Sequence, residues 1–208
     1  MMIGSKPKIV LLGMMTKMPV AGAVWGTMHY LIGLQRLGYE VYYVEAHGIR
    51  PYWTFMEDCP DASAKAAQFI QSVMKRFDLQ DRWAFHALHS DGQCFGMTEL
   101  QLKELYRSAS LIINYHGGTI PLPEHSATGR LIYLETDPVE LEIELFEGKQ
   151  PAIDFLEPHA AIFTWGLNFN NPDCKVPLPP GKVFHPSCPA VVTDLWQGPS
   201  NGQPQRLF

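Results

Sequence analysis

The feature that most constrains the fold is the alternation of short apolar runs with helix-patterned segments. Residues 8–15 read KIVLLGMM, a nearly continuous apolar run that is typical of a parallel strand covered on both faces. The next segment repeats apolar residues at the spacing of one helix face: Val24, Met28, Leu31 and Leu34. Gly38 stands where that helix ends, and residues 40–45, EVYYVE, favour a second strand. This opening predicts a right-handed βαβ unit.

The alternation continues through the rest of the chain. Further helices are predicted over residues 61–77, 98–107, 139–146 and 151–157. Further strands are predicted over residues 83–88, 110–115, 131–134 and 160–164. Thr98 and Gln101 have the spacing of a capping box, and residues 168–186 are rich enough in Asn, Pro and Gly to predict a loop. The predicted fold class is α/β, a Rossmann-like three-layer sandwich with a mostly parallel sheet and helices on both faces.

The length and the composition of the last residues predict one domain followed by a linker. A chain of 208 residues is long enough for one sizeable buried core and short for two. Residues 197–205 read QGPSNGQPQ, which is the composition of a linker. We therefore expect a domain over residues 1–196 and a linker over residues 197–208 that leads toward a second domain.

The charge balance argues against a nucleic-acid-binding protein, and the absence of several motifs argues against P-loop, zincin and GxSxG hydrolase chemistry. Sixteen Lys and Arg against 21 Asp and Glu give a net charge of −5, and no basic block marks a nucleic-acid partner. No apolar run approaches the roughly 18 residues of a membrane-spanning helix, and the first apolar run reads as a buried strand, so we expect a cytoplasmic protein. The four cysteines form no CxxC pair, and no metal site is expected. Phosphate-binding GxxxxGK[ST], HExxH, GxSxG and GxGxxG motifs are all missing.

Polar and glycine residues gather where the predicted strands end. Ligands of open α/β sheets bind beyond the carboxyl ends of the strands, so these residues form the candidate site. It consists of Thr16, Pro19 and Gly22 after the first strand, His47 after the second, His116, Gly117 and Gly118 after the strand at 110–115, Glu135 and Asp137 after the strand at 131–134, and Trp165 after the last.

Each of these residues has a functional and a structural interpretation. A histidine beside two glycines can transfer a proton near neutral pH in a tight turn, although residues 116–118 also fit a purely structural turn. Glu135 and Asp137 alternate along an extended segment and so can face one cleft, unless Asp137 caps the following helix. Trp165 is either a core residue or a surface on which a sugar ring stacks. His47 also fits an ordinary loop, and Gly22 a close approach of helix and sheet.

Six segments resemble known glycosyltransferases. Residues 9–13 (IVLLG), 19–25 (PVAGAVW) and 34–45 (LQRLGYEVYYVE) look like the opening of a GT-B glycosyltransferase, in which a turn similar to RLGHEV leads into the second strand. Residues 133–138 (YLETDP) and 163–166 (FTWG), with 171–174 (NPDC), resemble a bacterial glycosyltransferase family. This resemblance covers nearly the whole chain.

The resemblance implies that the chain is the acceptor-side half of a sugar-transferring enzyme. A GT-B enzyme has two Rossmann-like domains, of which the N-terminal one receives the acceptor and the C-terminal one binds the nucleotide-sugar donor. A C-terminal donor-binding domain and a small-molecule or glycan acceptor are therefore the implied partners, and the donor is a co-substrate rather than a cofactor. Many family members carry a catalytic histidine or acid in the loop after the first strand, where this chain has Thr16 and Lys17.

The role of catalytic base therefore passes to other residues. We expect His116 or Asp137, and after them His47, to take the proton of the acceptor hydroxyl. Thr16, Pro19, Gly22, Gly117, Gly118, Glu135 and Trp165 are expected to shape or contact the substrate site. Two alternatives remain open: a non-catalytic Rossmann-like binding or assembly module, and a nucleotide-dependent oxidoreductase. The second alternative rests on Glu45, which ends the second strand where dinucleotide-binding domains place a ribose-binding acid.

Overall fold

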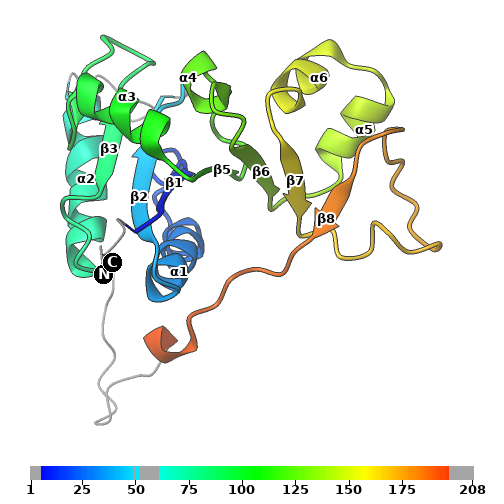
Figure 1. The fold of residues 1–208 in the computed structure, drawn as a ribbon, viewed down its shortest axis with the longest axis horizontal. Helices are drawn as coiled ribbons and strands as arrows, with labels where there is room; N and C mark the ends of the chain where they lie inside the picture. The colour runs from blue at the N-terminus through cyan, green and yellow to red at the C-terminus, as the bar shows by residue number, and fades with distance from the viewer. Residues whose placement is uncertain (1–5, 49, 52–60, 197–208) are drawn as a thin grey trace, which may run out of the picture.

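The fold was analysed in a computed structural model that describes residues 6–48, 50–51 and 61–196 (Figure 1). The strands are β1 (Lys8–Leu12), β2 (Glu40–Glu45), β3 (Trp83–His86), β4 (Cys94–Phe95), β5 (Leu111–Tyr115), β6 (Leu131–Glu135), β7 (Ala161–Thr164) and β8 (Phe184–Pro186). The helices are α1 (Ala21–Arg36), α2 (Ala62–Arg76), α3 (Glu99–Ser108), α4 (Pro123–Ser126), α5 (Glu140–Phe146), α6 (Gln150–Leu156) and the 3-10 turn η2 (Thr193–Trp196). The expected linker over residues 197–208 lies outside the described residues.

The strands form one sheet in the order β4-β3-β2-β1-β5-β6-β7-β8. Every neighbouring pair is parallel except β3 and β4, which are antiparallel. The chain runs outward from β1 to β3 and then returns to the other side of β1 as β5. The strand order therefore reverses between β1 and β5, which is where doubly wound sheets place their ligands.

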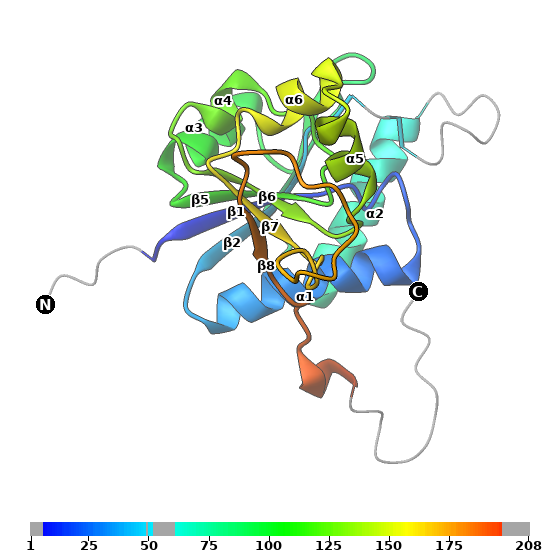
Figure 2. The ribbon, with the colours of Figure 1, turned by 90° about the vertical axis from the view of Figure 1, so that its right-hand side faces the viewer.

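Helices cover both faces of this sheet, as predicted (Figure 2). Alternate residues of β1 point to opposite faces: Ile9 and Leu11 pack with α1 and α2, whereas Val10 and Leu12 pack with α3. A third apolar cluster joins α5 and α6 to β6, β7 and β8 on the face that α3 covers. This three-layer arrangement confirms the predicted Rossmann-like α/β fold class.

The local signals that predicted the elements are mostly visible in the structure. Thr98 and Gln101 form the expected capping box at the start of α3. Gly38 follows the end of α1 with φ of +96°, a conformation that glycine adopts without strain. The predictions lacked β4, α4 and β8, which have two, four and three residues and are too short to show a hydrophobic period.

Beyond β8, the chain returns to α1 (Figure 1). The backbone N–H of Val192 donates to Nδ1 of His29 at 3.1 Å, and Arg36 makes a two-point ion pair with Asp194. These contacts hold η2 against α1. Of the helices in the described part of the chain, none combines the length and the apolar character that crossing a membrane requires.

Candidate functional site

A cavity of about 550 Å³ lies at the carboxyl edge of the sheet, where the strand order reverses. Its walls come from the loop after β1, the first turns of α1, the end of β5 and the residues that follow β6 and β7. Its polar lining residues are Thr27, Tyr115, His116, Thr136 and Asp137, and its apolar lining residues include Met14, Met15, Met18, Val20 and Trp165. The cavity therefore combines an apolar body with a polar side that contains a histidine and a carboxylate.

His116 occupies a strained turn at this polar side. Its φ is +64°, a left-handed conformation that is uncommon outside glycine, and Gly117 follows with φ of +70°. Nδ1 of the ring is hydrogen-bonded to the hydroxyl of Thr136. Burial lowers the pKa of His116 to about 4, against an opposing effect of the Asp137 charge. The imidazole is therefore neutral at physiological pH, and its lowered pKa makes it a weaker base than an ordinary histidine.

Asp137 lies on the cavity and is exposed to solvent. The residue at the N-terminal cap of α5 is Val139, whose N–H donates to Oε2 of Glu142 at 2.7 Å. The structure thus places the Asp137 carboxylate at the cavity, near the His116 ring, and assigns the capping contact to another pair. Asp137 is close enough to His116 to stabilise the protonated ring electrostatically.

Aromatic groups and the start of α1 form another part of the cavity wall. Trp165 is half-buried, donates its indole N–H to the Tyr30 hydroxyl at 3.2 Å and stands edge-on to His116 with ring centres 6.4 Å apart. Tyr115 is fully buried, and its hydroxyl has no hydrogen-bond partner among the described residues. Gly22 leaves open space at the start of α1, whose first turn carries no side-chain cap. This wall offers ring faces and helix N–H groups to a ligand.

Gly117, Gly118 and Asn114 support the turn from behind rather than line the cavity. A Cβ on Gly117 would lie 3.0 Å from the Tyr133 ring, and one on Gly118 would lie 2.6 Å from the Met14 sulfur. The buried Asn114 amide donates to the Thr119 carbonyl at 2.8 Å and contacts Nε2 of His159 at 3.1 Å. These contacts fix the backbone that presents His116. Pro19 is half-buried between two cavity residues, Met18 and Val20.

Thr16 and His47 belong to a second, sealed group. Glu45 is fully buried and accepts hydrogen bonds from the Thr16 N–H at 2.9 Å, the Thr16 hydroxyl at 2.5 Å and the Tyr43 hydroxyl at 2.5 Å. His47, which is also buried, contacts the same carboxylate through Nε2 at 3.1 Å. The Glu45 carboxylate is therefore used inside the protein, and this group fixes the loop after β1.

Glu135 is likewise buried, although it directly precedes the cavity residues Thr136 and Asp137. Its Oε2 accepts a hydrogen bond from the Thr164 hydroxyl at 2.5 Å, and its side chain also contacts Glu142. Burial, with smaller effects of Glu142 and Asp137, raises the pKa of Glu135 to about 8. The structure thus brings together His116, Asp137, Gly22 and Trp165 at the cavity and leaves Thr16, His47 and Glu135 beneath the surface.

Tyr115, Thr136 and the three methionines of the cavity were not among the predicted site residues. Thr136 had a usable signal, because it lies between Glu135 and Asp137 directly after a buried strand. Tyr115 and the methionines had none, since apolar and aromatic residues at strand ends fit a core equally well.

Within the described ranges, no group of three or more His, Cys, Asp or Glu side chains is arranged to hold a metal ion. The chain matches no protein-family model and no curated protein.

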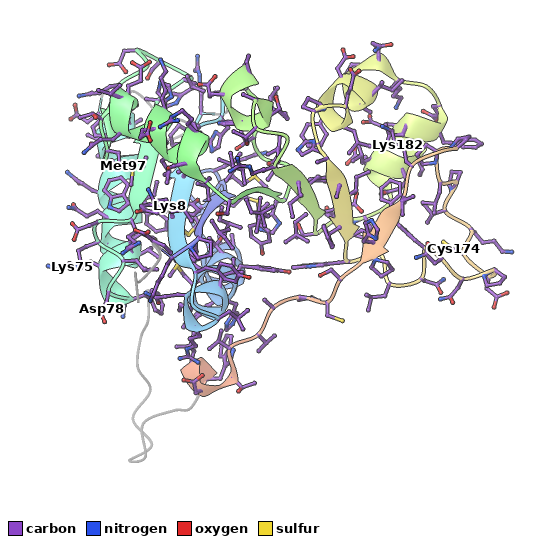
Figure 3. All side chains as sticks on the ribbon, viewed as in Figure 1. Lys8, Lys75, Asp78, Met97, Cys174 and Lys182 are labelled. Carbon is purple, nitrogen blue, oxygen red and sulfur yellow. The ribbon has the colours of Figure 1, made fainter. Side chains whose placement is uncertain are left out.

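A second hollow of about 610 Å³ lies away from the cavity, between β2 and α3. Its lining includes Lys8 and Met97, which are labelled in Figure 3. Cys174 and Lys182, also labelled there, lie in the long loop between β7 and β8. These four residues lie outside the cavity.

Proposed function

We propose that the cavity binds the acceptor of a sugar-transfer reaction and that the chain is the acceptor-side half of a GT-B-like glycosyltransferase. The observation that carries this proposal is the convergence of His116 and Asp137 with Trp165 on one cavity at the point where the strand order reverses. A neutral imidazole beside a carboxylate can take up a hydroxyl proton, and an indole ring offers a stacking surface for a sugar.

In the proposed reaction, the acceptor hydroxyl gives its proton to His116 or to Asp137 as its oxygen attacks the anomeric carbon of the donor sugar. The bond between that carbon and the departing nucleoside diphosphate breaks at the same time. The hydrogen bond between Nδ1 of His116 and Thr136 orients the ring. The Asp137 charge stabilises the imidazolium that forms.

The carboxyl edge of the sheet around the cavity supports the idea of an opposite wall. Loops from four strand ends each present a large apolar side chain to solvent: Met18 at 50% exposure, Val20 at 54%, Ile120 at 73%, Val139 at 41% and Leu167 at 54%. Exposed apolar side chains gathered at one edge favour contact with another protein surface. In this proposal, that surface is the donor-binding domain, which supplies the groups that hold the nucleotide-sugar.

The same exposed rim also favours the alternative of a non-catalytic assembly module, which would use the edge for binding alone. The oxidoreductase alternative has less support, because Glu45 is enclosed by Thr16, Tyr43 and His47 and does not reach a ligand. A binding experiment with three probes separates these possibilities.

We would titrate the 208-residue chain with 4-nitrophenyl β-D-glucoside, UDP-glucose and NAD⁺ and follow the backbone and indole N–H signals by NMR. The proposal expects the glucoside to shift the signals of His116, Asp137 and the Trp165 indole, with UDP-glucose and NAD⁺ leaving them in place. His116→Asn should weaken glucoside binding, whereas His185→Asn, the same change at an exposed histidine of β8, should not. Shifts caused by NAD⁺ alone, or by none of the probes, would contradict the proposal.

A further inference from the structure

Two buried carboxyl groups face each other beside the cavity. Glu135 ends β6 and Glu142 lies in α5, and the structure leaves both side chains without solvent exposure. One oxygen of each group has a donor: Oε2 of Glu135 is bonded by Thr164 at 2.5 Å, and Oε2 of Glu142 is bonded by the N–H of Val139 at 2.7 Å. The two Oε1 atoms are buried and receive no hydrogen bond from a donor group of the described residues.

The contact between these carboxyl groups requires a proton. Their side chains lie within hydrogen-bonding reach of each other, yet an ionised carboxylate only accepts hydrogen bonds. Two ionised groups in this position would repel each other in a buried environment, where charge is poorly screened. One proton shared between the two carboxyl groups removes this repulsion, and the Oε1 atoms, which receive no other hydrogen bond from the described residues, are the oxygens available to hold it.

We propose that Glu135 and Glu142 share one proton and that this acid pair positions Thr136 and Asp137 at the cavity. The segment between them is held at both ends, by Glu135 at the end of β6 and by the Glu142 carboxylate on the N–H of Val139. Val139 has φ of +117°, an uncommon conformation for a β-branched residue, so an external contact is needed to maintain it. The acid pair provides that contact, and both glutamates act as positioning residues.

The groups around the pair favour keeping the proton. Tyr133 and Asp137 are the titratable side chains that face it from β6 and the following loop, and β7 contributes the hydroxyl of Thr164. None of these three groups carries positive charge. Because the pKa of Glu135 is raised to about 8, the folded protein holds a proton at neutral pH that an unfolded chain releases above its ordinary pKa of 4.5.

The sign of the pH dependence follows from this difference. A carboxyl group with a raised pKa stabilises the fold fully below its unfolded pKa, and this stabilisation is lost as the pH rises through the folded pKa. The loss of one shared proton raises the equilibrium constant of unfolding by up to about tenfold per pH unit between pH 5 and 8. The inference rests on the proposed function in taking the cavity as the functional site, but its measurements need no ligand.

The first experiment measures the two carboxyl groups directly in the wild-type chain by ¹³C NMR between pH 4 and 10. One group of the pair should titrate near pH 8, well above an ordinary glutamate. The imidazole signals of His116 should shift with the same midpoint, because the ring is bonded to Thr136. This second signal reports the positioning role, since a pair that only stabilised the core would leave the His116 ring unchanged.

The second experiment compares Glu135→Gln with wild type by urea unfolding between pH 7 and 9. Glutamine has the shape of a protonated glutamate and can donate its amide hydrogen to Glu142, so the variant should lose the pH dependence and the His116 shift near pH 8. Glu140→Gln changes an exposed carboxyl of the same helix and should behave as wild type.

Either of two results would overturn the proposal. In the first, both buried glutamates titrate near their ordinary pKa in the wild-type chain, a result that does not depend on any variant folding. In the second, the pair titrates near pH 8 while the His116 signals stay constant. Failure of glucoside binding with the shared proton present would count against the proposed function and leave the acid pair intact.

Discussion

Two groups of chemically similar residues lie at the carboxyl edge of the sheet, one buried and one on a cavity. Beyond β1 and β2, the sealed group joins Thr16, Tyr43, Glu45 and His47, and all four residues are buried. Beyond β5 and β6, the open group places His116, Thr136 and Asp137 on a cavity. Both groups hold a threonine, a histidine and a carboxylate.

Hydrogen-bond saturation separates the two groups. In the sealed group, the Glu45 carboxylate receives the Thr16 N–H, two hydroxyls and a contact from His47, so its acceptor capacity is used within the chain. In the open group, Asp137 is exposed and the adjacent Tyr115 hydroxyl has no partner among the described residues. Saturated polar groups stabilise a fold, whereas an exposed carboxylate on a cavity remains available to a ligand.

Removal of the central acceptor of the sealed group should lower the free energy of unfolding more than any other change considered below. Glu45→Ala leaves the Thr16 N–H, the Tyr43 hydroxyl and the His47 ring without their common partner in a buried environment. We expect a loss of about 3 to 5 kcal/mol in the free energy of unfolding, measured with urea. Asp137→Ala, which removes the carboxylate of the open group, should cost less than about 1 kcal/mol. Equal losses in the two variants would show that the open group stabilises the fold as much as the sealed group does.

A smaller loss of stability is expected when the backbone turn that presents the open group is altered at Gly117. Gly117→Ala adds a Cβ that lies 3.0 Å from Tyr133 and 3.2 Å from Phe155, at a residue with φ of +70°. We expect a loss of about 2 to 3 kcal/mol from strain and crowding together. Gly129→Ala has a similar φ of +66° with open space around the Cβ, and should cost about 1 kcal/mol. Because the two variants share the backbone strain, the difference between their stabilities in thermal unfolding gives the effect of crowding at residue 117. A loss of stability in Gly129→Ala as large as that in Gly117→Ala would contradict an effect of crowding.

The titration of His116 gives the next effect. Its pKa of about 4 in the folded chain lies below the ordinary value of 6.5, so the folded state binds fewer protons than the unfolded state between these values. The corresponding stability is present above pH 6.5 and is lost as the pH falls toward 4, by up to about 1.4 kcal/mol per pH unit. Urea unfolding at pH 7, 6 and 5 should show the wild type losing stability relative to His116→Asn. Parallel pH profiles would show that the ring is not held neutral by the fold.

The sequence predicted most of the fold because its elements carry local signals. The run at 40–45 became β2 with the same bounds, and Thr98 caps α3 as its spacing required. β8 escaped prediction because three residues in a loop rich in Pro and Asn show no alternation, and their pairing with β7 is set by the tertiary fold.

The candidate site was predicted in part, and the limits have a physical cause. Strand ends identified His116, Asp137, Gly22 and Trp165, all of which line the cavity. The position after a strand end also selected Thr16, His47 and Glu135, which are buried. That position predicts the edge of the sheet at which a residue lies, but not the groups with which its side chain forms contacts. Glu135 and Asp137 were expected to share a cleft, yet Glu135 packs against Thr164 and Glu142 while Asp137 reaches the cavity. Glu142 lies seven residues after Glu135, beyond any local pattern.

Replacement of the His116 side chain should change the stability least, and this result tests directly whether the open group holds the fold together. Asparagine tolerates the left-handed backbone that His116 adopts, and the ring belongs to an open group, so His116→Asn should change stability by less than about 1 kcal/mol at pH 7.5. His116→Ala lacks that tolerance and should cost about 1 kcal/mol more. Urea unfolding of the two variants separates the contribution of the backbone from that of the ring. A loss in His116→Asn as large as that in Glu45→Ala would mean that His116 holds the fold together as Glu45 does, and the open group would then be a second structural network beside an incidental cavity.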